Sequence, residues 1–196
     1  RNFTTECDYK KGLLDEDILN RMKLIMEELE LKKEDRVPVE PARAYALKLK
    51  EKSEDNEMPM VMAFEMNDGK VITGKSTSLM DSCSAAILNG VKYLANIGDE
   101  IFLLSPVIIE AIKNLKRESL ESKNTTLNAN EVLIALSVGA VTNPTAQLAL
   151  DHLKYLNGVQ AHSTVILTTD DEQILRKLGI DLTCDPIYPS ENLYYI

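Results

Sequence analysis

Apolar residues recur at helical spacing in the first part of the chain and in short β-branched runs further along. Two helices are predicted before residue 53, one opening in the acidic turn 15–17 and one covering residues 40–52, with Pro41 in its first turn. The first helix has the apolar set Ile18, Met22, Ile25, Met26 and Leu29. Two such helices cannot bury a core by themselves, so we expect them to dock on something else.

Beyond residue 58 the pattern alternates between strands and helices. The runs 59–66 and 70–74 predict a β-hairpin, because the Asn-Asp-Gly turn between them suits two adjoining strands. The other expected elements are helices at 81–96, 106–122, 130–141, 144–156 and 170–178, and strands at 100–105, 159–168 and 180–184. This order predicts an α/β fold, a three-layer α/β/α sandwich in which the hairpin makes the sheet mixed.

Charge divides the chain into two unequal parts. Of the first 57 residues 27 are charged, against 26 of the remaining 139. We therefore expect a charged helical segment at 1–57 and an α/β sandwich subdomain at 58–196. The chain of 196 residues starts with Arg1 rather than Met, which suggests a piece of a longer protein whose N-terminal domain is missing.

The overall charge argues against nucleic acid and membranes as partners. The net charge is -9, basic residues occur at most in pairs, and no apolar run approaches the ~20 residues that span a bilayer. Three scattered cysteines fit free thiols in a reducing cytoplasm. The sequence gives no reason to expect a cofactor.

A phosphate-binding loop is formally present at residues 69–76, which match the spacing G-x-x-x-x-G-K-S. A working loop needs a strand before the first glycine and a pliable stretch between the glycines. Here the intervening Val71, Ile72 and Thr73 are stiff strand formers, and residues 67–69 already make a turn. The hairpin interpretation is therefore preferred.

The connection after this hairpin holds the best candidate ligand-binding residues. Free N–H groups at a helix start, hydroxyls and one amine favour an anion, and a second strand-to-helix junction at residues 105–106 would bring another helix start to the same sheet edge. The candidate ligand-binding residues are Lys75, Ser76, Thr77, Ser78 and Ser105. The alternative is an ordinary helix cap in a solvated loop.

Asp81, Cys83 and His162 are weak candidates for catalysis. Asp81 or His162 could transfer a proton, and Cys83 would lie in a first helical turn, where the helix dipole can lower a thiol pKa. A cap, a buried thiol and a structural histidine are the alternatives. We predict no bound transition metal, because neither Cys-x-x-Cys nor His-x-Glu occurs and these groups do not converge.

Long stretches of the chain resemble a known bacterial family. They are VITGKSTSLM from Val71, NEVLIALS from Asn130, TNPTAQLAL from Thr142, HSTVIL from His162 and LGIDLTCDP from Leu178. They resemble the C-terminal part of the domain-of-unknown-function family eighteen-forty-six, also called uncharacterised protein family three-seven-one. The resemblance implies a longer, oligomeric, cytoplasmic protein with no established biochemical function.

The resemblance also implies a cytidine-deaminase-like topology without the zinc motif. The deaminase helix starts carry His-x-Glu and Pro-Cys-x-x-Cys; here only the Ser-Pro of residues 105–106 remains, so zinc-dependent deamination lacks its ligands. Two functions stay open. One is metal-free binding, or catalysis, of a small anionic or phosphorylated metabolite. The other is a structural or oligomerisation module of a longer protein, whose catalytic part is N-terminal and missing from this chain.

Overall fold

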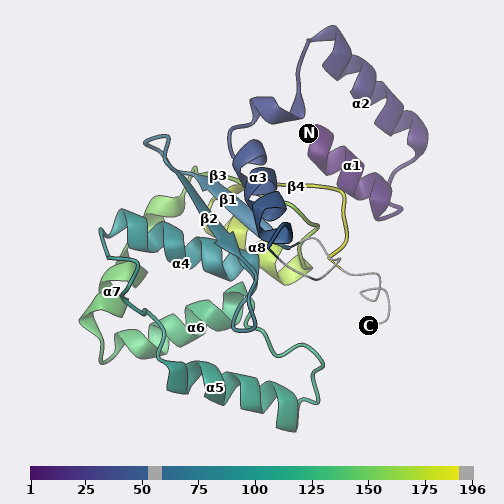
Figure 1. Ribbon diagram of the computed structural model, residues 1–196. Helices are drawn as coiled ribbons and strands as arrows, with labels where there is room; N and C mark the ends of the chain where they lie inside the picture. The colour runs from purple at the N-terminus through teal and green to yellow at the C-terminus, as the bar shows by residue number, and fades with distance from the viewer. Residues whose placement is uncertain (53–58, 190–196) are drawn as a thin grey trace.

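A computed structural model describes residues 1–52 and 59–189 of the chain. At its centre is one mixed sheet with the strand order β2-β1-β3-β4 (Figure 1). The strands are β1 (Val61–Glu65), β2 (Val71–Lys75), β3 (Gln160–Ser163) and β4 (Asp181–Cys184). β1 is antiparallel to both β2 and β3, whereas β3 and β4 are parallel. The predicted α/β class and mixed sheet are confirmed.

Eight α-helices surround this sheet in the described residues. They are α1 (Asn2–Lys10), α2 (Glu16–Glu28), α3 (Val39–Lys50), α4 (Ser82–Leu94), α5 (Pro106–Asn114), α6 (Ala129–Ala140), α7 (Pro144–Asp151) and α8 (Thr169–Lys177). Single turns of other helix types lie at Lys33–Asp35, Leu115–Ser119 and Leu153–Leu156. The likeness to the cytidine-deaminase topology stays a prediction.

Helices cover both faces of the sheet because β1 alternates two apolar sets. Val61 and Ala63 pack with α3 on one face, and Met62 and Phe64 enter the larger core under α4 on the other (Figure 1). β2 comes very close to α4 at Gly74, where an added Cβ would lie 2.2 Å from the backbone nitrogen of Ala86. The sheet is therefore buried on both sides, as in a layered sandwich.

The expected hairpin is present. β1 and β2 pair from Glu65 opposite Val71 to Val61 opposite Lys75, and Gly69 takes a φ of 82° in the turn. Positive φ suits glycine, which has no Cβ to clash. Because residues 71–73 are paired strand residues, the glycines at 69 and 74 do not enclose a phosphate loop.

The expected strand at 100–105 is wrong. Residues 98–104 form bends, and Leu103 and Leu104 are buried in the core under α4 without pairing with any strand. Only half of this apolar run enters the core, because Ile101 and Phe102 are exposed. Periodicity cannot separate these outcomes for a run of four apolar residues.

Other boundaries also differ from the expectation. The strand predicted at 159–168 ends at Ser163, the helix at 106–122 changes to a π-turn after Asn114, and the helix at 144–156 ends at Asp151. Helix ends fray and tighten in this way where cap and packing, rather than periodicity, decide the last turn.

The first 52 residues do not form one detached unit. α3 is part of the sandwich, because Val39, Ala42 and Ala46 are fully buried. α1, which the pattern did not predict, packs beside β4, and α2 packs on α1. The predicted boundary near residue 58 borders residues 53–58, which lie outside the described part, so it stays a prediction. Within that described part, no helix is both long and apolar enough to cross a bilayer.

Candidate functional site

A short bridge brings the starts of α4 and α6 together. Met80 pairs with Leu127 as an isolated parallel bridge. The N–H of Asp81 donates to the carbonyl of Leu127 at 3.1 Å, and the N–H of Leu127 donates to the carbonyl of Leu79 at 2.9 Å. Two segments that lie far apart in the sequence thus place two helix N-termini next to each other.

Two carboxylates occupy the helix starts at this junction. Asp81 caps α4, accepting from the N–H of Ser84 at 2.7 Å. Asp171, in the first turn of α8, accepts from the N–H of Ala129 at the start of α6 at 3.0 Å and from the hydroxyl of Thr168 at 2.7 Å. The carboxylate of Asp81 therefore faces the positive end of α4, and that of Asp171 faces the positive ends of α6 and α8.

The pKa of Asp81 is raised at this junction. Burial raises the pKa of Asp81 to about 6, the negative charge of Asp171 adds to that rise, and the hydrogen bonds from Ser84 oppose it. Asp81 is thus half-protonated near pH 6 and charged above it. At neutral pH the junction is negative, so an anion is attracted to it less than the sequence suggested.

The residues before α4 are only partly available to a ligand. Lys75 and Ser78 are exposed. The hydroxyl of Thr77 accepts from two N–H groups of the following turn, at 3.2 and 3.3 Å. The Oγ of Ser76 is buried and has no hydrogen-bond partner among the described residues. Ser76 is therefore the residue of this group with a buried polar atom left unpaired by the described residues.

The structure does not bring Ser105 to this junction. Ser105 is exposed and precedes α5, but bends rather than a strand lead into it. In Figure 1, α6 lies between α4 and α5, so the start of α5 belongs to another layer. The predicted pair of strand-to-helix junctions at one sheet edge depended on the strand at 100–105, which does not form.

The thiols are buried rather than activated. Cys83 is in the first turn of α4, as expected, but burial followed by the charges of Asp171 and Asp81 raises its pKa well above the ordinary value. Burial also raises the pKa of Cys7 to about 11 and that of Cys184 to about 12. Thiolates are disfavoured at all three positions, which argues against a cysteine nucleophile.

His162 lies on the other face of the sheet. It is fully buried; its Nδ1 is 2.9 Å from the hydroxyl of Thr183, and its Nε2 is 3.4 Å from Oδ2 of Asp185. The ring also packs on Phe3 of α1, with centroids 4.8 Å apart. Its neighbour Ala161 faces the core under α4, so β3 separates His162 from Asp81.

A partly buried ion pair completes this second cluster. Arg43 of α3 donates from Nε and Nη2 to the two oxygens of Asp185, at 3.0 and 2.6 Å. Asp185 is 6% exposed, and Arg43 also binds Glu34 at 2.8 Å. The pair ties α3 to the end of β4, and sequence reasoning missed it because the partners are 142 residues apart.

Sequence reasoning also missed Asp171, although a local signal was present. Thr168 and Asp171 have the three-residue spacing of a helix cap, and so do Asn128 and Glu131 at the start of α6. These spacings could have located two helix starts. That those starts lie next to Asp81 could be learned only from the tertiary structure.

Two surface hollows of about 520 Å³ each lie away from Asp81. One runs along β4 between α1 and α8, and the other lies between β2 and the end of α4. None of the predicted site residues lines either of them. Residues 1–52 and 59–189 contain no group of three or more His, Cys, Asp or Glu side chains that could hold a metal ion. The expectation of no bound metal stays a prediction.

Sequence comparison decides which family this fold and site represent. The family described as "Domain of unknown function DUF1846, C-terminal" matches residues 34–194. The chain belongs to the DUF1846 family. This confirms the resemblance drawn from the sequence, and DUF1846 as a family has no established function.

Several clostridial proteins match this DUF1846 chain from end to end. A UPF0371 protein of Clostridium tetani is 59% identical over 195 residues, and UPF0371 proteins of Clostridium botulinum and Clostridioides difficile are 58% and 57% identical. Each match covers 100% of this chain but 39% of the relative. The chain thus spans about two fifths of the length of these relatives.

Proposed function

We propose that this chain is a structural and docking part of a longer protein, whose chemistry is carried by the part that the chain does not span. One observation carries the proposal: α2 presents an apolar row to solvent. Ile18 is 43% exposed, Ile25 47% and Leu29 62%. Apolar side chains gathered on one helix face mark a contact surface more often than a catalytic one.

The state of the chemically capable groups supports this proposal. Asp81 and Asp171 cap helices, and Asp185 is held by Arg43 in a partly buried ion pair. Groups used in this way stabilise the fold, and the shifted pKa values of Asp81 and Asp185 have a structural origin. A cytoplasmic location and the absence of nucleic-acid binding remain predictions.

The test cleaves a full-length polypeptide that carries this chain. A specific protease site is inserted before Arg1, the folded protein is cut, and the pieces are run on size-exclusion chromatography. We expect the two pieces to elute together at micromolar concentration, because the exposed apolar row is buried between them. Pieces that separate completely at tens of micromolar would show that the chain is not a docking part.

A second candidate is a metal-free site for a small anionic or phosphorylated metabolite at the start of α4. The observation that favours it is the buried Oγ of Ser76, which has no partner among the described residues and lies beside Lys75. Asp81 and Asp171 oppose an anion there while both are charged. Protonation of Asp81 would lessen that opposition.

Inorganic phosphate provides the matched test of this second candidate. Because the pKa of Asp81 is about 6, lowering the pH from 8 to 5 should tighten phosphate binding at least about 3-fold relative to the same pH change in Asp81→Asn, in which phosphate titrates identically. Asp81→Asn keeps a capping side chain but has no charge to lose, so it should reduce this pH dependence. Isothermal titration measures both proteins, with Ser76→Ala as the loss-of-binding control. No heat of binding at either pH would eliminate the candidate.

A further inference from the structure

The apolar row of α2 is a regular stripe. Ile18, Met22, Ile25 and Leu29 are spaced by four, three and four residues, the spacing of a helix seam that packs on another element. Three of the four are more than two fifths exposed, and Met22 is half-buried. We call these four residues the α2 stripe. It differs from scattered surface leucines because its members share one side of a helix.

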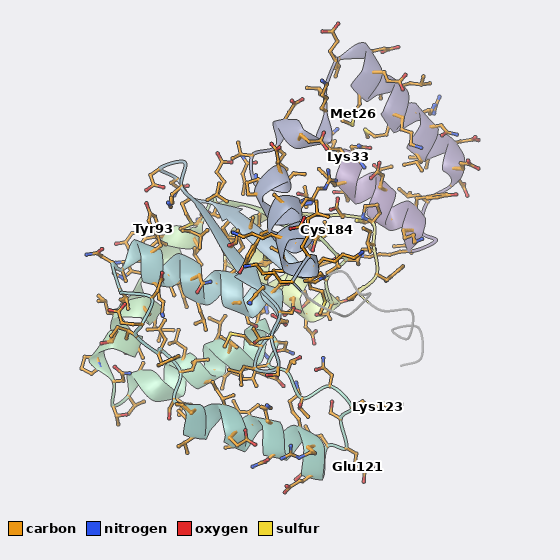
Figure 2. The ribbon with its side chains drawn as sticks, in the orientation of Figure 1. Met26, Lys33, Tyr93, Glu121, Lys123 and Cys184 are labelled. Carbon is orange, nitrogen blue, oxygen red and sulfur yellow. The ribbon has the colours of Figure 1, made fainter. Side chains whose placement is uncertain are left out.

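The helix that carries the stripe is firmly held. The buried side chain of α2 is Leu19, which is 8% exposed, and α2 packs on α1. α1 is fixed in turn by Phe3 against His162 and by Cys7, whose thiol donates to the carbonyl of Cys184 at 3.3 Å. Figures 1 and 2 show α1 between α2 and the sheet, with α2 standing away from the body. The stripe is therefore held outward on a fixed support.

The extent of the family match indicates which partner would cover the α2 stripe. The C-terminal family description begins to match at residue 34, so α1 and α2 precede it. The relatives nevertheless align over the whole chain, α1 and α2 included, and continue for about three fifths of their length outside it. We propose that the α2 stripe packs against the part of the same polypeptide that this chain does not span. This inference rests on the proposed docking function.

The charges on α2 argue against a second copy as the occupant. Glu16 and Asp17 lie in its first turn and Glu27 and Glu28 in its last, and its basic residues lie between them. Two copies of α2 side by side would place acidic turns against acidic turns in both the parallel and the antiparallel orientation. Such like-charge contacts disfavour self-pairing.

The experiment compares two aspartate substitutions on the same helix in the cleaved full-length polypeptide. Ile25→Asp places a charge in the stripe, whereas Asn20→Asp makes the same charge change on nearly the opposite side of α2. We expect Ile25→Asp to weaken association of the two pieces at least about 10-fold, and Asn20→Asp to change it less than about 2-fold. Circular dichroism of the isolated chain verifies that both variants fold.

The outcomes separate this inference from the proposed function. If the wild-type pieces associate and Ile25→Asp does not weaken them, the stripe is not the contact, although the docking function stands. If the wild-type pieces never associate, the docking function itself is wrong. If the isolated chain is a dimer that Ile25→Asp converts to a monomer, a second copy occupies the stripe and the inference is overturned.

Discussion

Gly74→Ala should destabilise the fold by roughly 3 kcal/mol, an overpacking effect at the upper end of the usual range. The added Cβ would lie 2.2 Å from the backbone nitrogen of Ala86 and 2.7 Å from the carbonyl carbon of Ala85. These are backbone atoms of α4 and cannot move as a flexible side chain would. Relief requires α4 to shift away from β2, which opens the core around Ile87 and Phe64.

Urea unfolding measures this effect, with Gly139→Ala as the control. Gly139 lies in α6, and its added Cβ would meet nothing nearer than the carbonyl oxygen of Leu103 at 4.0 Å. That variant should be unchanged or up to about 1 kcal/mol more stable, because alanine favours a helix. Equal unfolding midpoints for Gly74→Ala and wild type would show that β2 and α4 are not in such close contact.

Asp185→Asn should cost about 2 kcal/mol, somewhat less than removing one member of a fully buried ion pair, because the side chain of Arg43 is 31% exposed although that of Asp185 is buried. The substitution leaves the guanidinium of Arg43 without its two charged hydrogen bonds and His162 without its carboxylate neighbour. Asp181→Asn is the matched control, because Asp181 also pairs with an arginine, Arg36, at 3.0 Å but with a side chain 68% exposed. Such an exposed pair contributes less than about 1 kcal/mol.

The carboxylate of Asp185 should also contribute to the loss of stability in acid. Burial opposes its ionisation, but the contacts with His162 and Arg43 outweigh burial and lower the pKa of Asp185 to about 2 from 3.8. A lowered pKa gives stability that is present above the unfolded value and is lost as pH falls through the folded one. Wild type should therefore lose stability between about pH 4 and pH 2 more steeply than Asp185→Asn. Parallel pH profiles for the two proteins would contradict this.

Local sequence was sufficient wherever neighbouring residues determine the conformation. The Asn-Asp-Gly turn between two β-branched runs predicted the hairpin, and α2, α4 and α8 begin within two residues of the expected positions. Caps, turn residues and apolar spacing involve residues only a few positions apart, so a short stretch of sequence is enough to predict their effect. The α/β class followed from the order of these elements.

The run Ile101–Leu104 shows where local information ends. Its composition is that of a strand, but a strand also needs a sheet edge with free N–H and C=O groups beside it. β3, some 60 residues later in the chain, holds the position next to β1; Leu103 and Leu104 are buried in the helical core, whereas Phe102 is 81% exposed. The loss of this strand also removed Ser105 from the predicted site.

The candidate site divides in the same way. The sequence by itself determined that a helix starts near Asp81, that the thiol of Cys83 lies in its first turn, and that α2 is amphipathic, because each depends on helical spacing alone. Only the tertiary structure decided that Asp171 joins Asp81 and that Arg43 reaches Asp185. It also decided that His162 faces the other side of the sheet, and that the α2 stripe stays uncovered. The physical reason is that electrostatic and packing energies depend on distance in space, which sequence separation does not fix.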